Sequence, residues 1–133
     1  LVRGDGLFLD PRWSPDGRTI AYSALTDTDG DGWLDAHRDS PRIFLVDFAS
    51  GVGGMGRRAL TTAATLGYAP AWSPDGMTIA YVVMPAQDGG GVGTAVNRFG
   101  DIALVDAHCA GDCPLRELSS ETTDDFAPVW SPR

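Results

Sequence analysis

The chain reads PAWSPDGMTIAY over residues 70–81 and PRWSPDGRTIAY over residues 11–22. The start of the same phrase, PVWSP, returns at residues 128–132. Ser-Pro-Asp-Gly is a turn sequence, because proline presets one turn dihedral, aspartate bonds to the nearby backbone and glycine takes a positive φ. The residues after each turn are rich in side chains that favour strands. The phrase therefore predicts a β-hairpin that occurs twice and begins a third time.

A second block repeats downstream of the first. It reads IFLVD over residues 43–47 and IALVD over residues 102–106. A glycine-containing turn and an Arg-x-Leu step follow each block, at residues 58–60 and 116–118. No window shows the helical period, so each repeat predicts four strands. We expect these strands at the tryptophan, at 19–23 and 78–82, at 43–47 and 102–106, and around Leu60 and Leu118.

The repeat predicts an all-β fold, a β-propeller segment with two complete four-stranded antiparallel blades and flanking strands of neighbouring blades. The expected divisions are the last strand of a preceding blade at 1–10, complete blades at 11–61 and 69–119, and the first strand of a following blade at 127–133. Propellers close with about 4–8 blades. We therefore expect either a segment of a longer chain or several copies that assemble into a ring. We expect the repeated Trp13, Trp72 and Trp130 to lie in the core between blades.

The phrase P-x-W-S-P-D-G-x-x-I-A-Y, followed by I-x-L-V-D and R-x-L, resembles the TolB-type propeller repeat. The resemblance covers nearly the whole chain except two long insertions. It implies the propeller fold and leaves the function open, because one fold hosts many functions. Members of this family include the periplasmic propeller of the Tol system, propeller domains that precede serine peptidases, and secreted proteins of unknown role.

An acidic loop separates the second and third expected strands of the first blade, and it reads DTDGDGWLD over residues 27–35. This spacing matches the first nine positions of an EF-hand loop. Its expected ligands are the carboxylates of Asp27, Asp29, Asp31 and Asp35 and the backbone carbonyl of Trp33. Position 12 is Arg38, which cannot ligate a cation, so the loop instead looks like the calcium hairpins of integrin-type propellers.

Four carboxylates so close together repel one another unless a cation neutralises them. Calcium fits best, because it accepts six to eight oxygens in flexible geometry, whereas magnesium demands tighter order. We expect one structural Ca²⁺ that orders the loop. The alternative is a solvated acidic loop without a cation.

Cys109 and Cys113 are the two cysteines of the chain, and they flank an expected hairpin turn. A C-x-x-x-C pair across such a turn can bring two sulfurs within bonding reach. His108 next to them leaves a metal ligand set incomplete. We therefore expect a disulfide, which persists in oxidising compartments. With the calcium loop, it predicts an extracytoplasmic protein that is periplasmic, on the cell surface or secreted.

Charge restricts the partners. The formal net charge is −8, with 18 acidic residues against 10 basic ones. Such a chain repels nucleic acid and anionic lipid, and no apolar run reaches the length that a membrane-spanning helix needs. The expected partners are a protein, the remaining propeller blades or further copies of this chain. Arg57 and Arg58 could bind an anion, but we interpret them as solvated edge residues that discourage strand pairing.

A catalytic set is hard to assemble from these residues. The chain has no G-x-S-x-G nucleophile elbow, and a cation would occupy the acidic loop. We therefore expect a non-catalytic binding or scaffolding propeller. The alternative is the propeller domain of a larger secreted or periplasmic hydrolase of the serine-peptidase type. The Gly-rich insertion at 85–100, with Gly89–Gly93 at its centre, is either a binding loop or a tolerated insertion.

Overall fold

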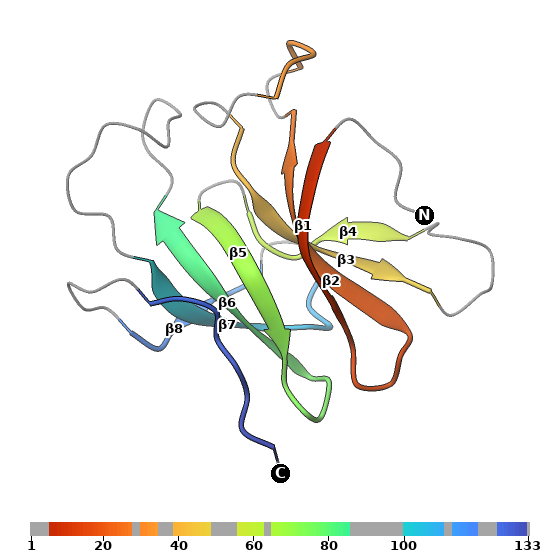
Figure 1. The fold of residues 1–133 in the computed structure, drawn as a ribbon, viewed down its shortest axis with the longest axis vertical. Coiled ribbons are helices and arrows are strands. Elements are labelled where there is room, and N and C mark those ends of the chain that lie inside the picture. The colour runs from red at the N-terminus through yellow and green to blue at the C-terminus, as the bar shows by residue number, and fades with distance from the viewer. Residues whose placement is uncertain are drawn as a thin grey trace.

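The computed structural model describes residues 6–27, 30–34, 39–48, 56–62, 65–85, 100–110, 113–119 and 125–132. These residues form two four-stranded antiparallel sheets and contain no helix. Sheet 1 is ordered β1-β2-β3-β4 and sheet 2 is ordered β5-β6-β7-β8. Figure 1 shows them side by side, with sheet 1 in red to yellow and sheet 2 in green to blue. The all-β prediction with two four-stranded antiparallel units is therefore confirmed.

The strands follow the repeat. In sheet 1 they are β1 (Gly6–Trp13), β2 (Thr19–Thr26), β3 (Arg42–Asp47) and β4 (Arg57–Ala59). In sheet 2 they are β5 (Thr65–Trp72), β6 (Thr78–Pro85), β7 (Asp101–Asp106) and β8 (Arg116–Glu117). The third and fourth strands are shorter than the first two in both sheets, so each sheet tapers in the same direction along the chain.

The Ser-Pro-Asp-Gly turns close the first hairpin of each sheet by the same bonds. Ser73 Oγ donates to Asp75 Oδ1 at 2.6 Å and accepts the Thr78 N–H at 2.9 Å. The corresponding turn of sheet 1, from Ser14 to Thr19, has the same two bonds at the same distances. Gly76 has a φ of 73°, the left-handed region that glycine enters without steric cost. The turn chemistry read from the sequence is thus the chemistry that holds the hairpins.

The first strand of each sheet carries the tryptophan, and it contains a β-bulge at the proline two residues before that tryptophan. The register of β1 against β2 shifts between Leu9 and Arg12, and that of β5 against β6 shifts between Tyr68 and Ala71. The residue before each proline takes a positive φ, 52° at Asp10 and 49° at Ala69. A bulge of this kind bends a strand without ending it.

The two bulges correct two expected boundaries. Residues 6–10 do not form the last strand of a preceding blade, because they continue through the bulge into Trp13 and pair with β2, with Gly6 opposite Thr26. The second unit likewise begins earlier than residue 69, at Thr65. Proline at the bulge concealed this continuity, since a proline normally demotes a run of strand residues. Residues 1–5 lie outside the described part of the chain.

The main core lies between the two sheets. One face of sheet 1 packs on one face of sheet 2, and the buried side chains of this core are Ala21, Ile43, Leu45, Leu60, Ile79, Tyr81, Val83, Ala103, Val105 and Ala107. Gly67 allows the close approach, because a Cβ added there would lie 3.1 Å from Ile43 Cγ1. Both repeats therefore contribute side chains to a single shared core.

The other face of sheet 1 carries a smaller aromatic cluster. Phe8 and Phe44 flank Tyr22, each with ring centroids 5.9 Å from it. The guanidinium groups of Arg42 and Arg57 lie 5.4 and 4.6 Å from the centre of the Phe44 ring. Tyr22 and Phe44 are only 4% exposed, so this face is largely covered within the chain itself.

Candidate functional site

The acidic loop leaves β2 and folds back on its first aspartate. Asp27 Oδ1 accepts the Gly30 N–H at 2.6 Å, and Asp27 Oδ2 accepts the Gly32 N–H at 2.9 Å. Gly30 and Gly32 have φ values of 76° and 82°, which a side chain rarely tolerates. The glycines thus let the backbone wrap around the Asp27 carboxylate.

A second aspartate of the loop is held in a similar way. Asp31 Oδ1 accepts the Trp33 N–H at 2.8 Å. The Trp33 side chain is 78% exposed, so its ring does not cover the loop. Asp29 and Asp35 lie outside the described residues, as does Arg38. Within the described ranges, no three His, Cys, Asp or Glu side chains gather as a metal site.

The residues of the loop fit a hard cation in their chemistry. A carboxylate offers about four lone-pair sites, and each oxygen of Asp27 uses one in the bonds above. The donor set consists of oxygens, which calcium prefers. The expected calcium ligands stay a prediction, because the geometry of the full set falls outside the described residues. Asp39, which follows the loop, is buried at 2% exposure.

The two cysteines meet at the β7–β8 connection. The Sγ atoms of Cys109 and Cys113 lie at disulfide-bonding distance, and the Cα atoms are 5.7 Å apart. Asp106 orders the same connection, because its Oδ1 accepts the His108 N–H at 2.8 Å. Cys113 packs against the main core. This geometry agrees with the predicted pairing and links the turn to the core.

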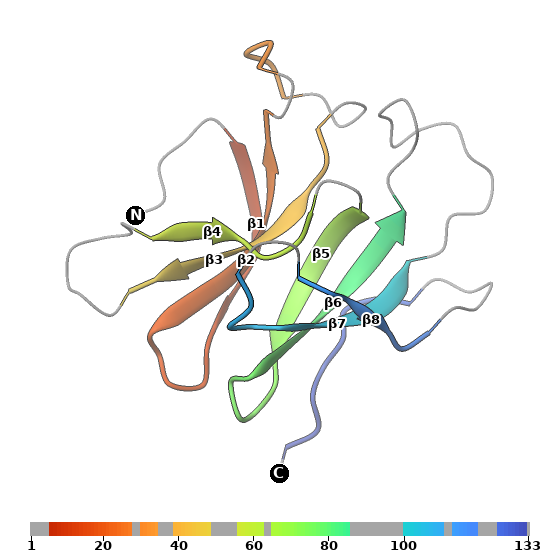
Figure 2. The same cartoon turned by 180° about the vertical axis from the view of Figure 1, so that it is seen from behind.

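Arg58 makes the contact that the sequence did not predict. From β4 it donates Nη1 to the Cys109 carbonyl at 2.6 Å and Nη2 to the Ala107 carbonyl. Figure 2 shows the end of β7 reaching toward β4, where this contact lies. The interpretation of Arg58 as a solvated edge residue is wrong, because its guanidinium is part-buried between the sheets. The sequence held one signal of this role, because the arginine recurs at the same place in the second repeat as Arg116.

The repeated tryptophans join successive repeats through their indole N–H groups. Trp72 Nε1 donates to the Arg12 carbonyl at 3.1 Å, and Trp130 Nε1 donates to the Ala71 carbonyl at 2.9 Å. Each acceptor directly precedes the tryptophan of the previous repeat. Trp72 also packs against the main core, whereas Trp13 is 54% exposed.

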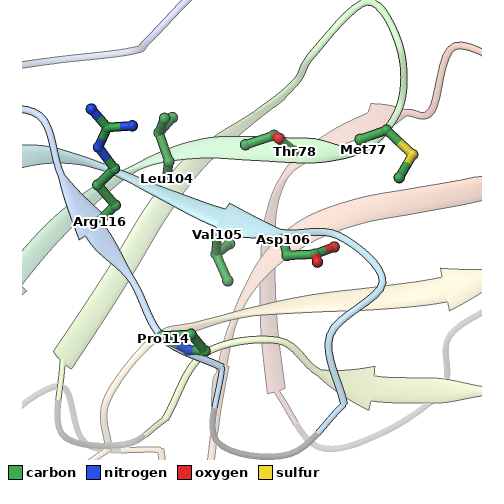
Figure 3. Close-up of a pocket in the computed structure, with 7 residues that line it drawn as sticks. All are labelled: Met77, Thr78, Leu104, Val105, Asp106, Pro114 and Arg116. Atoms are coloured by element: carbon green, nitrogen blue, oxygen red, sulfur yellow. The ribbon is translucent and has the colours of Figure 1, made fainter.

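A hollow of about 290 Å³ lies on sheet 2. Figure 3 shows its lining, which is Met77, Thr78, Leu104, Val105, Asp106, Pro114 and Arg116. Leu104 and Arg116 point to one side of the sheet and Val105 to the other. The Asp106 carboxylate already bonds to the turn backbone. Two polar residues of the lining, Thr78 and Asp106, pair directly across β6 and β7.

Burial raises the pKa of the tyrosine hydroxyls in this structure. The pKa of Tyr81 rises to about 12, first because its surroundings exclude water and second because the Glu117 carboxylate disfavours a negative charge nearby. Burial also raises the pKa of Tyr22, and the Arg57 guanidinium partly offsets that rise. Both hydroxyls therefore remain protonated at physiological pH.

Across the described segments, no helix is long and apolar enough to span a bilayer. The insertion at 86–99, including Gly89–Gly93, lies outside those segments.

No protein-family profile matches the chain. Among curated proteins, the chain is similar to the uncharacterized peptidase YuxL of Bacillus subtilis, with 36% identity over 156 aligned residues that cover 98% of this chain and 21% of that protein. It is also similar to the Tol-Pal system protein TolB of Alcanivorax borkumensis, with 29% identity over 89 residues that cover 67% of this chain and 17% of that protein. The chain therefore spans about a fifth of the length of these relatives. These distant similarities agree with a propeller-like fold.

Proposed function

We propose that this chain is a non-catalytic binding or scaffolding segment of an extracytoplasmic β-propeller, stabilised by one calcium ion. The observation that carries the proposal is the repeated inter-sheet contact. The Trp72 indole of sheet 2 donates a hydrogen bond to the backbone of sheet 1, and the Trp130 indole of residues 125–132 donates the equivalent bond to the backbone of sheet 2. A unit that repeats each contact with its neighbour is typical of propellers and other repeat proteins.

Two features support a location outside the cytoplasm. The Cys109 and Cys113 sulfurs lie at bonding distance, and disulfides persist in oxidising compartments. Calcium loops of modest affinity are filled at extracellular calcium concentrations. The similarity to TolB, a Tol-Pal system protein, points the same way.

In this proposal Asp27, Asp29, Asp31 and Asp35 and the Trp33 carbonyl hold the calcium. The two Gly N–H bonds to Asp27 preorganise the entry of the loop. The ion would neutralise the mutual repulsion of the carboxylates and fix the β2–β3 connection. Its role is structural, because it orders the β2–β3 connection. A connection that is already ordered loses less entropy when a partner binds.

Calorimetric calcium titration of the folded chain tests this site. We expect one ion per chain and a rise in the thermal midpoint, since a ligand at a hundredfold excess over its Kd stabilises by about 2.7 kcal/mol. Asp31→Asn should weaken calcium binding, whereas the matched control Asp10→Asn should not, because Asp10 lies in the β1 bulge. A folded chain that takes up no calcium would contradict the proposal.

A second function is favoured by the similarity to a peptidase. The identity with YuxL extends over nearly the whole chain but only a fifth of that protein. The chain would then be the propeller domain of a larger secreted or periplasmic hydrolase of the serine-peptidase type. Serine-directed fluorophosphonate labelling of the complete natural protein separates the two functions. Labelling outside these 133 residues selects the hydrolase, and its absence selects the scaffold.

A further inference from the structure

The outer face of sheet 2, the one turned away from sheet 1, repeats the face of sheet 1 that is already covered. Both faces carry alanine on the second strand, isoleucine and leucine on the third, leucine after the fourth and arginine within the fourth. On sheet 1 these are Ala21, Ile43, Leu45, Leu60 and Arg58, and on sheet 2 they are Ala80, Ile102, Leu104, Leu118 and Arg116. Leu60 is 1% exposed under sheet 2, whereas Leu118 is 54% exposed.

Three contacts hold sheet 2 on the covered face of sheet 1. The Trp72 indole donates to the Arg12 carbonyl. The Gly67 N–H donates to the Pro41 carbonyl at 2.8 Å. Arg58 donates to two carbonyls of the β7–β8 connection. The donors of the first two contacts lie on β5, the first strand of sheet 2. The donor of the third contact lies on β4 of sheet 1.

Residues 125–132 repeat the first two contacts on sheet 2. The Trp130 indole donates to the Ala71 carbonyl at 2.9 Å. The Asp125 N–H donates to the Gly100 carbonyl at 2.8 Å, and Gly100 stands where Pro41 stands in the first repeat. Ala127 has a φ of 45°, like Ala69 at 49° in the second repeat. The segment thus lies on sheet 2 as the start of β5 lies on sheet 1.

The third contact has a donor on sheet 2. Arg116 pairs with Leu104 in the register and points to the same side of the sheet (Figure 3). It is exposed, whereas Arg58 is part-buried. Beside this outer face lies a hollow of about 420 Å³, which Ile102, Leu104, Leu118, Phe126 and Val129 help to line. Phe126 and Val129 are 73% and 90% exposed.

We propose that the outer face of sheet 2 binds a further four-stranded sheet of this same repeat, which residues 125–132 enter as its first strand. Arg116 donates to two backbone carbonyls in the connection between the third and fourth strands of that sheet. Leu118, Phe126 and Val129 become buried. This inference deepens the proposed propeller by naming the occupant of one face, and it needs neither calcium nor an extracytoplasmic location.

Two observations favour a further repeat over a second copy of this chain. A copy would dock through its own Trp13, but Trp130 already occupies the Ala71 carbonyl that Trp13 would need. Sheet 1 also carries Phe8 and Phe44 where sheet 2 has Gly67 and Ala103 in the inter-sheet core. Added bulk at such a close contact forces the packed sheets apart.

The test compares the 133-residue chain with one in which residues 75–132 are repeated directly after Pro132. This extension completes a Ser-Pro-Asp-Gly turn that begins at Ser131, and it supplies the remaining three strands of a third sheet. Hydrogen exchange of the Leu118 and Asp125 amides is measured in both chains, each with and without Arg116→Met. We expect slower exchange in the extended chain, and we expect Arg116→Met to speed it by about tenfold or more there, as the loss of a charged hydrogen bond does.

In the natural chain Arg116→Met should leave the exchange of these amides unchanged. Arg116→Lys in the extended chain should fall between wild type and Arg116→Met, because lysine keeps the charge and loses the planar fork. Unchanged exchange of the two amides on extension would overturn the proposal. So would self-association of the natural chain, seen by sedimentation, that Arg116→Met abolishes, because the occupant would then be a second copy. A failed calcium titration would leave these outcomes intact.

Discussion

At the scale of single residues, Arg58 and Arg116 show how burial changes the contribution that the same type of side chain makes to stability. Arg58 bridges two backbone carbonyls across the inter-sheet contact. Bonds from a charged donor contribute about 1.5–3 kcal/mol each, more than neutral ones. Arg116 occupies the same place in the sequence repeat but is exposed. The pair therefore gives a matched comparison within one chain.

Arg58→Met should lower the free energy of unfolding by about 2–4 kcal/mol, because it leaves the Ala107 and Cys109 carbonyls without their donor. Arg116→Met should change it by no more than about 0.5 kcal/mol, as surface substitutions usually do. Urea denaturation of both variants provides the measurement. Equal effects of the two substitutions would show that Arg58 is not a special inter-sheet contact.

Tyr81 should make the fold sensitive to alkaline pH. Its pKa rises to about 12 in the folded chain against about 10 in an unfolded one. Between these values the unfolded chain loses a proton that the folded chain keeps, so stability is complete below about pH 10 and falls as the pH rises toward 12.

Tyr81→Phe removes the titrating hydroxyl, and the fall in stability above pH 10 should become shallower. Chemical denaturation at pH 9 and pH 11 measures the difference. Wild type and Tyr81→Phe with identical pH profiles would refute the assigned role of this hydroxyl. Tyr22 retains a raised pKa in both proteins, so some alkaline loss should persist.

At the scale of strands and turns, the sequence predicted most of the fold because its signals are local. The Ser-Pro-Asp-Gly turns, the strand-favouring runs and the repeat of both located the hairpins. The strand boundary at residues 6–10 was wrong because the bulge at Asp10 depends on pairing with β2, which no local pattern records. Arg58 was missed for a related reason, since its acceptors lie about fifty residues away.

The β7–β8 connection contains the Cys109–Cys113 pair, which two substitutions or a reductant can remove. The double variant Cys109→Ser/Cys113→Ser should lose about 2 kcal/mol of stability, the amount that chain entropy gives for a loop this short. Added reductant should lower the stability of wild type by the same amount and leave the double variant unaffected. Two free thiols in the non-reduced, denatured wild type would contradict the pairing.

The double variant should also weaken the Arg58 contact, because the connection presents the Cys109 carbonyl to that guanidinium. In a double-mutant cycle, Arg58→Met should then cost less in the cysteine-free background than in wild type. Additive losses would mean that the carbonyls keep their position without the cysteines.

At the scale of the whole molecule, the two repeats act as one folding unit. The main core draws side chains from both sheets, among them Leu60 from the first repeat and Tyr81 from the second. Hydrogen bonds cross between the sheets at Gly67, Trp72 and Arg58. Neither sheet alone would bury this apolar surface, which is the reason repeat units depend on their neighbours.

Native-state hydrogen exchange of the natural chain tests this claim most directly. The amides that lie inside sheet 1, such as Leu45, and those inside sheet 2, such as Ala80, should exchange through one common opening with the same free energy. Gly67, whose N–H crosses to the Pro41 carbonyl, should exchange with them. Two separate opening free energies, with Gly67 exchanging freely while one sheet stays protected, would contradict a shared core built from successive repeats.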